Sequence, residues 1–219
     1  MQRVALVDLG MGNLRSVERA LQRAGEDAGA PCAVVRTGDP EAVASADKVV
    51  VPGQGAFRDC AAALAGGLGD ALRAQIGRGT PYLGICLGLQ ALFEGSEEAP
   101  GAPGLGIFAG QVVRLPDGLR DPATNEILKI PHMGWNTIRM EREPEGPLRV
   151  LAGEAAPYVY FVHSYHAAPA EPSLVAAVAE HGPHRITAAI EQGNVTATQF
   201  HPEKSQAAGI RLLGAFLAR

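Results

Sequence analysis

Short apolar runs alternate with helix-like segments over the first 95 residues, and this alternation constrains the fold more than any other feature. Four runs have the character of buried strands: 3–9 (RVALVDL), 32–36 (CAVVR), 48–53 (KVVVPG) and 81–85 (PYLGI). Helical patterns occupy residues 15–24, ending at Gly25, a segment that begins at Phe57, and residues 87–95. Strands and helices that alternate in this way predict βαβ units and a parallel sheet.

The pattern changes after residue 100. Stretches rich in β-forming residues, separated by Gly, Pro and Asn turns, lie at 104–115, 135–140, 158–165, 174–180, 184–192 and 195–200. We expect them to add antiparallel strands to a mixed sheet, and a last helix to span roughly residues 205–218. The sequence thus predicts an α/β fold, an open, mostly parallel mixed sheet flanked by helices, in a single domain covering residues 1–219.

Composition narrows the classes of function. The net charge of −4 provides no basic field to attract nucleic acid or an anionic membrane, so neither is an expected partner. The amino terminus is typical of a first strand and not of a signal peptide, and we expect a cytoplasmic protein. The 3 cysteines have no CxxC spacing, which favours reduced thiols over disulfides or a zinc site.

Cys86 lies within PYLGICLGLQ (81–90), where a predicted strand passes directly into a predicted helix. A G-x-C-x-G turn at such a junction is typical of a nucleophile elbow, and Gly84 and Gly88 leave room for the tight backbone. The thiol would lie at the amino end of the helix, where the helix dipole favours a thiolate and the Leu87 N–H could bind an oxyanion. The alternative is a small buried cysteine in a turn, and the motif alone does not decide between them.

A possible base lies downstream in VTATQFHPEKS (195–205). Pro202 disfavours a helical backbone at His201, and in an extended chain His201 and Glu203 point to the same side. A thiolate, a histidine and a carboxylate then form a nucleophilic triad. The alternative is a surface turn leading into the last helix. The other histidines have no metal-ligand spacing, so we predict no metal site.

Taken together, GICLGLQ, QFHPEKS and VVVPGQGAF (49–57) resemble the class I glutamine amidotransferases, which have a flavodoxin-like fold. Within that family, DLGMGNLRSV (8–17), PHMGWN (131–136) and FVHSYHA (161–167) look like the glutaminase subunits of imidazole glycerol phosphate synthase. The resemblance extends from about residue 4 to the carboxy terminus.

The resemblance implies a role for particular residues. Cys86 would be the nucleophile, His201 the acid and base, and Glu203 the group that orients His201. The oxyanion hole would combine the Leu87 N–H with an N–H of the glycine loop, that of Gln54 or Gly55, beside Gly53. The residues implied to hold the substrate's amino-acid end are Gln90, Glu98, His163, Ser164 and Tyr165.

It also implies a reaction and a partner. L-Glutamine would be hydrolysed to glutamate and ammonia through a cysteine thioester, without metal or organic cofactor. A (β/α)8-barrel cyclase subunit, bound as a heterodimer, would use the ammonia to make imidazole glycerol phosphate and aminoimidazole carboxamide ribotide in histidine biosynthesis. We hypothesise that this partner reorients the glycine loop. The candidate interface residues are Asn13, Arg15, His132, Met133, Gly134, Trp135 and Lys204.

Three other functions compete with this interpretation: a cysteine peptidase or related hydrolase, an amidotransferase serving GMP, anthranilate or carbamoyl phosphate synthesis, and a subunit that has lost hydrolysis. The glycine loop combined with both triad motifs disfavours the first, PHMGWN and FVHSY disfavour the second, and the intact triad disfavours the third. GMGN (10–13) is a plain turn, because Arg15 replaces the third glycine of a dinucleotide loop. Two departures from the family are a longer segment at 115–135 and a polar Gln54.

Overall fold

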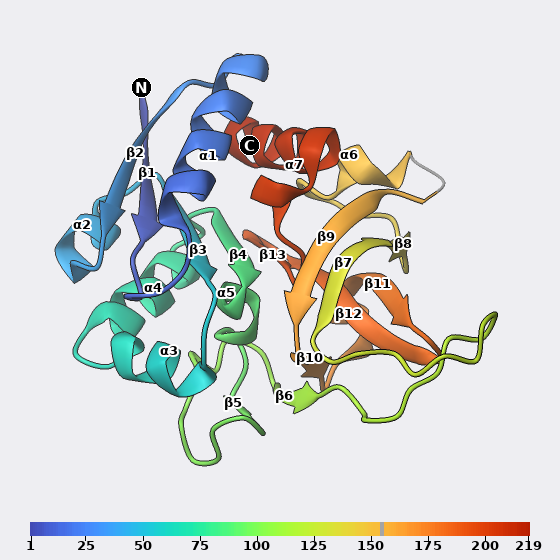
Figure 1. The fold of residues 1–219 in the computed structure, drawn as a ribbon. Helices are drawn as coiled ribbons and strands as arrows, with labels where there is room; N and C mark the ends of the chain where they lie inside the picture. Colours follow the sequence, from blue (N-terminus) through green and yellow to red (C-terminus); the bar gives the residue numbers. More distant parts are fainter. Residues whose placement is uncertain (154–155) are drawn as a thin grey trace.

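The computed structural model describes residues 1–153 and 156–219 and is built around an eight-stranded sheet (Figure 1). The strands lie in the order β2-β1-β3-β4-β13-β12-β11-β8. Their bounds are β1 Gln2–Val7, β2 Cys32–Thr37, β3 Lys48–Gly53, β4 Tyr82–Cys86, β8 Arg139–Met140, β11 Val175–His181, β12 His184–Gln192 and β13 Val195–Thr198. Pairing is parallel from β2 to β13 and antiparallel from β13 to β8, which confirms the predicted mixed sheet.

Helices cover both faces of the parallel half, which explains why its central strands β3 and β4 are buried at every residue. Val4 and Leu6 of β1 belong to the core beneath α1 and α7, whereas Ala5 and Val7 belong to the core beneath the helices of the opposite face. The helix bounds are α1 Leu14–Asp27, α2 Pro40–Ala44, α3 Phe57–Leu64, α4 Leu68–Gly77, α5 Leu87–Gln90, α6 Arg149–Ala152 and α7 Gln206–Ala218. The predicted last helix is confirmed.

The second half forms two further sheets that the sequence did not predict. One is the three-stranded sheet β10-β6-β5 and the other the two-stranded sheet β7-β9. Their strands are β5 Gly95–Ser96, β6 Gly110–Arg114, β7 His132–Thr137, β9 Tyr158–His163 and β10 Tyr165–Pro169. The later strands β8, β11, β12 and β13 join the main sheet and pair with one another in antiparallel fashion, as expected, whereas the others form the two smaller sheets. Strand β13 also pairs in parallel with β4.

Two predicted helix boundaries are also wrong, for different physical reasons. Gly25 lies inside α1 and not at its end, because a Cβ there would stand 2.9 Å from the Ala30 carbonyl oxygen, so the glycine permits close packing. Helix α5 spans only one turn and not residues 87–95, because the Leu105 N–H takes the Ala91 carbonyl at 2.7 Å. A single turn aligns few peptide dipoles, which removes the predicted support of a long helix for the Cys86 thiolate.

The long connection before β7 packs against the β11–β12 turn. It folds back on itself through a bridge between Arg120 and Ile127, and the His181 Nε2 contacts the Lys129 carbonyl at 3.1 Å. At the start of α1, the Asn13 side chain accepts a hydrogen bond from the Ser16 N–H and caps the helix. None of the helices in the described ranges is long and apolar enough to cross a membrane.

Candidate active site

Cys86 ends the central strand β4 in a strained conformation. Its φ is +54°, in the left-handed region that residues other than glycine rarely occupy, and α5 begins at the next residue. Positive φ at a strand-to-helix junction is the geometry of a nucleophile elbow, so the predicted turn is confirmed. The register pairs Cys86 with Gly53, which brings the glycine loop beside the thiol.

The two glycines around Cys86 are needed for close backbone contact. A Cβ on Gly88 would lie 1.7 Å from the Val51 carbonyl oxygen, and one on Gly84 would lie 2.6 Å from the Gly88 carbonyl oxygen. Both distances are far below van der Waals contact. Tyr82 adds a hydrogen bond of 3.0 Å from its hydroxyl to the Gly88 carbonyl. Strand, turn and helix are therefore held in one fixed arrangement.

His201 and Glu203 meet as predicted. His201 has an extended backbone, and its Nδ1 lies 2.8 Å from Oε1 of Glu203, with both side chains buried. Glu203 itself belongs to the 3-10 turn Pro202–Lys204, so the contact does not come from a continuous extended chain. The His201 N–H also donates to the Tyr160 carbonyl at 2.9 Å, which fixes the histidine beside β9.

The electrostatics of His201 link it to the nucleophile. Burial by itself lowers the pKa of His201, but hydrogen bonds and charges from Cys86 and Glu203 outweigh burial and raise the pKa to about 9. An imidazole with this pKa carries a proton at neutral pH. Cys86 and His201 therefore interact electrostatically, as a nucleophile and its base must.

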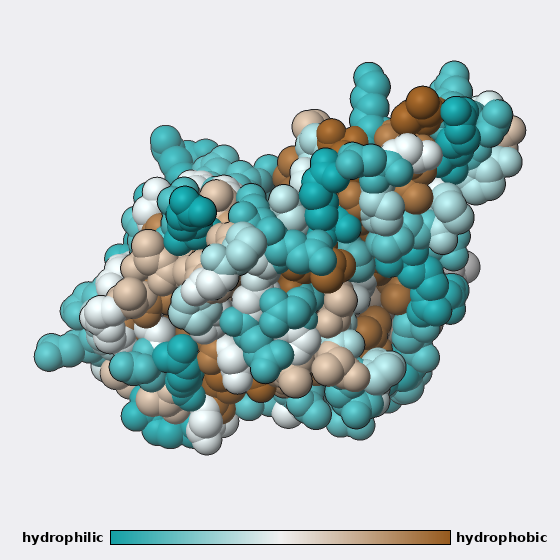
Figure 2. Space-filling view, turned by 90° about the horizontal axis from the view of Figure 1, so that it is seen from below, coloured by the Kyte–Doolittle hydropathy of each residue, from teal (hydrophilic) through white to brown (hydrophobic). Residues whose placement is uncertain are grey.

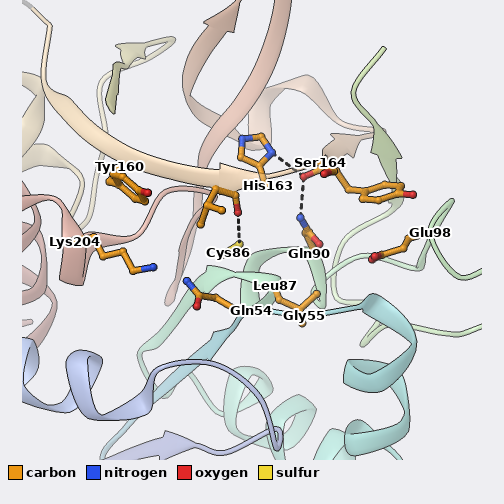
Figure 3. Close-up of a pocket in the computed structure, with 12 residues that line it drawn as sticks. Gln54, Gly55, Cys86, Leu87, Gln90, Glu98, Tyr160, His163, Ser164 and Lys204 are labelled. Carbon is orange, nitrogen blue, oxygen red and sulfur yellow. Dashed lines mark hydrogen bonds between the residues drawn. The ribbon is translucent and has the colours of Figure 1, made fainter. Parts of the chain in front are cut away.

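Cys86 opens into a cavity of about 360 Å³. Figure 3 shows Tyr160 and Lys204 on one side of Cys86 and Gln90 and Glu98 on the other. The lining residues are Gln54, Gly55, Cys86, Leu87, Gln90, Glu98, Tyr160, Val162, His163, Ser164, Tyr165 and Lys204. The predicted oxyanion-hole and substrate residues thus lie together around the thiol, except for Gly53, which ends β3 beside it.

The polar side chain of Gln54 reaches over His201. Its Nε2 lies 3.5 Å from Nδ1 and 3.4 Å from Nε2 of the imidazole. An aliphatic residue at this position would make no polar contact with the ring. Gln54 therefore contributes both its backbone to the loop and an amide to the environment of the base.

Polar groups on the far side of the cavity are held by specific contacts. Glu98 accepts a hydrogen bond from the Phe57 N–H at 2.9 Å. Gln90, 5% exposed, donates from Nε2 to the Tyr165 carbonyl at 2.9 Å and to Oε1 of Gln199 at 3.2 Å. Sequence reasoning missed Gln199, because its position before Phe200 and His201 gives no sign of what its side chain contacts.

A chain of neutral histidines supports the wall formed by residues 163–165. His163 Nδ1 contacts the Tyr165 carbonyl at 3.0 Å, and its Nε2 contacts His132 Nδ1 at 3.0 Å. Burial, reinforced by neighbouring histidines, lowers the pKa of His163 well below its usual value and that of His132 to about 4. With neutral rings, His163 donates to the Tyr165 carbonyl and accepts from His132.

These histidine contacts show that one predicted interface residue, His132, lies in the interior. His132 is 6% exposed and packs against Phe161, so its side chain is not available to a partner. The other candidates have surface: Asn13, Arg15, Met133 and Trp135 are exposed, and Gly134 and Lys204 are partly exposed. The alternation of inward and outward residues along β7 explains the difference.

The region around Trp135 lies next to the cavity. The Trp135 ring contacts that of Tyr160 with centroids 6.0 Å apart, and the Lys204 Nζ lies 5.6 Å from the Tyr160 ring centroid. Across residues 1–153 and 156–219, no cluster of three or more His, Cys, Asp or Glu side chains could hold a metal ion. The reactive side chains that the structure brings together at this site are the thiol, the imidazole and the carboxylate.

Comparisons with known proteins agree with this geometry. Residues 6–218 match the family model of class I glutamine amidotransferases. The subunit HisH of imidazole glycerol phosphate synthase from Methylococcus capsulatus is 51% identical, over 99% of this chain and 96% of that protein. The HisH subunit from Rhodospirillum rubrum is 47% identical, over 98% of each chain.

Solved structures show the same fold at lower identity. A crystal structure of a glutamine amidotransferase superposes with a TM-score of 0.69 at 21% identity, covering 98% of this chain and 97% of that one. PurLQS from Thermotoga maritima gives a TM-score of 0.68 at 20% identity, covering 100% and 99%. The chain belongs to the class I glutamine amidotransferases, in the family of the HisH subunits of imidazole glycerol phosphate synthase.

Proposed function

We propose that this chain is the glutaminase subunit of a histidine-pathway imidazole glycerol phosphate synthase, and that Cys86, His201 and Glu203 carry its chemistry. The observation that supports the proposal most is the strained Cys86 beside a buried His201, whose pKa Cys86 helps to raise and whose imidazole Glu203 holds at 2.8 Å. We extend the proposal to a single domain spanning residues 1–219 that works in the cytoplasm.

The first half-reaction forms a thioester. The Cys86 thiolate adds to the carboxamide carbon of L-glutamine, and the electron pair of the C=O bond moves onto oxygen. As the tetrahedral intermediate collapses, the C–N bond breaks and protonated His201 gives its proton to the departing nitrogen, which leaves as ammonia. Glu203 keeps the imidazole in the orientation and charge state that this transfer requires.

The second half-reaction restores the thiol. Neutral His201 takes a proton from water, the oxygen adds to the thioester carbonyl, and the C–S bond breaks to release glutamate and the Cys86 thiolate. The sum is glutamine plus water giving glutamate plus ammonia. The mechanism requires neither metal nor organic cofactor, because the nucleophile and the proton carrier are side chains of this chain.

Two backbone N–H groups would stabilise the oxyanion of each tetrahedral intermediate. Leu87 begins α5, and the first N–H groups of a helix have no partner within it. The second donor comes from the loop at Gly53, Gln54 and Gly55, and Gly53 pairs with Cys86 in register. Each such donor is worth roughly 3–4 kcal/mol, so a reoriented loop peptide would nearly silence hydrolysis. A partner subunit that reorients this peptide would therefore switch hydrolysis on or off.

The cavity suggests how glutamine lies. With the carboxamide at Cys86, the amino-acid end would extend toward Gln90, Glu98 and the strand segment of Ser164 and Tyr165. On that side the Glu98 carboxylate and the backbone carbonyls can accept from an ammonium, and the Ser164 and Tyr165 hydroxyl groups can donate to a carboxylate. Ammonia would then leave on the opposite side, past Tyr160 and Lys204.

That exit direction fits a partner subunit bound over β7 and β9. The surface beside the exit carries Trp135, 44% exposed, and Met133, 61% exposed, and we assign both to the interface with a (β/α)8-barrel cyclase. Asn13, Arg15, Gly134 and Lys204 would contribute its remaining contacts. Figure 2 views the end of the sheet where the parallel strands terminate, and its hydrophobic side chains are interspersed among hydrophilic ones. A mixed surface of this kind is typical of subunit interfaces outside their centre.

The proposal is tested by glutamate release from L-glutamine. We expect the wild type to release glutamate, slowly alone and faster with the cyclase and its ribotide substrate, and Cys86→Ala to release none under either condition. Cys32→Ala, which removes a half-buried thiol of β2, is the matched control and should retain activity. Release by Cys86→Ala at the wild-type rate would refute the assignment of the nucleophile.

A further inference from the structure

We propose that Gln199 is a positioning residue for the nucleophile: its amide donates to the Cys86 sulfur and ties that sulfur to the glutamine-binding wall through Gln90. The inference rests on the proposed function and extends it to a residue outside the triad. Gln199 lies directly after β13, two residues before His201, and its side chain is fully buried.

Three hydrogen bonds connect the nucleophile to the wall of the cavity. Gln199 donates from Nε2 to the Sγ of Cys86 at 3.4 Å, and its Oε1 accepts from Gln90 Nε2 at 3.2 Å. Gln90 Nε2 donates in turn to the Tyr165 carbonyl at 2.9 Å. Figure 3 shows Gln90 close to Cys86, with one of these contacts drawn to the strand above it.

Which group donates and which accepts in each of these hydrogen bonds follows from the chemistry of the groups. The Tyr165 backbone oxygen can only accept, so Gln90 must present its NH2 to it. The same NH2 faces Gln199, which must therefore present its oxygen to Gln90 and its own NH2 to Cys86. The orientation of the Gln199 amide thus follows from a backbone carbonyl, and its donor points at the sulfur.

A donor at this place acts on the charge of Cys86. In the thiol form, the Cys86 Sγ can donate to the Val162 carbonyl, 3.9 Å away, an interaction that the thiolate cannot make. The Gln199 NH2 interacts more strongly with the thiolate than with the thiol, because hydrogen bonds to a charged acceptor are stronger. Gln199 therefore favours the reactive form and limits the directions in which the sulfur can point.

The same amide couples the nucleophile to substrate recognition. Gln90 lines the end of the cavity where the amino-acid group of glutamine would lie, and one NH2 of Gln90 serves both Tyr165 and Gln199. A displacement of Gln90 would thus move the amide that holds Cys86. Loss of Gln199 should consequently lower kcat more than it raises KM.

The test measures the nucleophile directly. The rate of Cys86 alkylation by iodoacetamide is followed from pH 6 to 10 by peptide mass spectrometry, which separates Cys86 from Cys32 and Cys60. Gln199→Met keeps the size of the side chain but has no donor, and Gln199→Glu places an oxygen where the NH2 stood. The control is Gln75→Met. Gln75 is a second buried glutamine, it lies in α4 away from Cys86, and its amide donates to backbone carbonyls.

We expect the midpoint of the Cys86 alkylation profile to rise by about one pH unit in Gln199→Met, which slows alkylation about tenfold at pH values well below the wild-type midpoint. The rise should be larger in Gln199→Glu, and Gln75→Met should match the wild type. The other titratable groups around Cys86 are the same in all four proteins: Glu98, Tyr160, His163, Tyr165, His201, Glu203 and Lys204.

The outcomes separate the two proposals. A Gln199→Met or Gln199→Glu protein that is folded by circular dichroism and has the wild-type alkylation profile would overturn the role of Gln199. If glutamate release is abolished by Cys86→Ala while that profile is unchanged, the glutaminase stands and only the positioning role falls. Should Gln199→Met fail to fold, Gln199→Glu supplies the decisive profile, because its carboxylate can still accept from Gln90.

Discussion

The ion pair between His201 and Glu203 predicts a particular dependence of stability on pH, which Glu203→Gln should reduce. The folded-state pKa of His201 is raised from 6.5 to about 9 through Cys86 and Glu203. A raised histidine pKa stabilises the fold below the unfolded value of 6.5, and this stabilisation is lost as the pH rises through the folded value.

The magnitude follows from that difference in pKa. At 1.36 kcal/mol per pH unit, protonation of His201 contributes about 3 kcal/mol at pH 6.5, about 2 kcal/mol at pH 7.5 and under about 1 kcal/mol at pH 9. Glu203→Gln removes one of the two groups that raise the pKa of His201, and it must therefore lose part of this pH-dependent stability. The buried Oε2 of Glu203 has no hydrogen-bond partner among the described residues, so replacing the carboxylate costs little once His201 is neutral.

The assay is urea denaturation of wild type and Glu203→Gln at several pH values between 6 and 9.5. We expect the wild type to be the more stable protein at pH 6.5 and the two unfolding free energies to converge near pH 9. Groups away from the site titrate equally in both proteins, so the difference between the curves reports on His201 and Glu203 together with the neighbouring Cys86. Glutamate release by the variant should fall between about 10²- and 10⁴-fold. Parallel stability curves across this range would refute the assignment of the His201 charge to Glu203.

Two further predictions concern the elbow and the interface. Gly88→Ala should destabilise the protein by at least about 3 kcal/mol in urea, because its Cβ would lie 1.7 Å from the Val51 oxygen, whereas Gly77→Ala, which has open space, should not. A similar cost for both would show that the contact at Gly88 is unimportant. Trp135→Ala should weaken binding to the cyclase at least about tenfold by calorimetry, and Tyr158→Ala, at the far end of β9, should leave affinity close to wild type. Equal affinity of Trp135→Ala and wild type would remove Trp135 from the interface.

Features that depend on local sequence could be predicted well. The strand at 48–53 has the bounds expected, because a run of apolar residues buried on both faces has few other stable conformations. The Cys86 turn was predictable because glycines on both sides indicate close backbone contact. The pairing of strand β13 was harder to predict, because the sequence of a short strand does not reveal the direction of its neighbours. It pairs in parallel with β4 and antiparallel with β12.

Features that depend on distant partners could not be predicted. The length of α5 is set by the N–H of residue 105, and the role of Gln199 by a sulfur that lies far away in the sequence. The error at His132 was avoidable, because alternation along β7 separates it from the exposed Met133 and Trp135. The motif groups these residues together, whereas the pleat sends their side chains to opposite faces.

The position of β13 has a consequence for the order in which the enzyme can be made. Within the part of the chain that the structure describes, this four-residue strand alone lies between β4 and β12, and it follows every other strand of the sheet in the sequence. A ribosome must therefore synthesise all the other strands of this sheet before its two halves can join. Until that moment the thiol has no imidazole beside it, and a prematurely terminated chain carries the nucleophile without the means to use it.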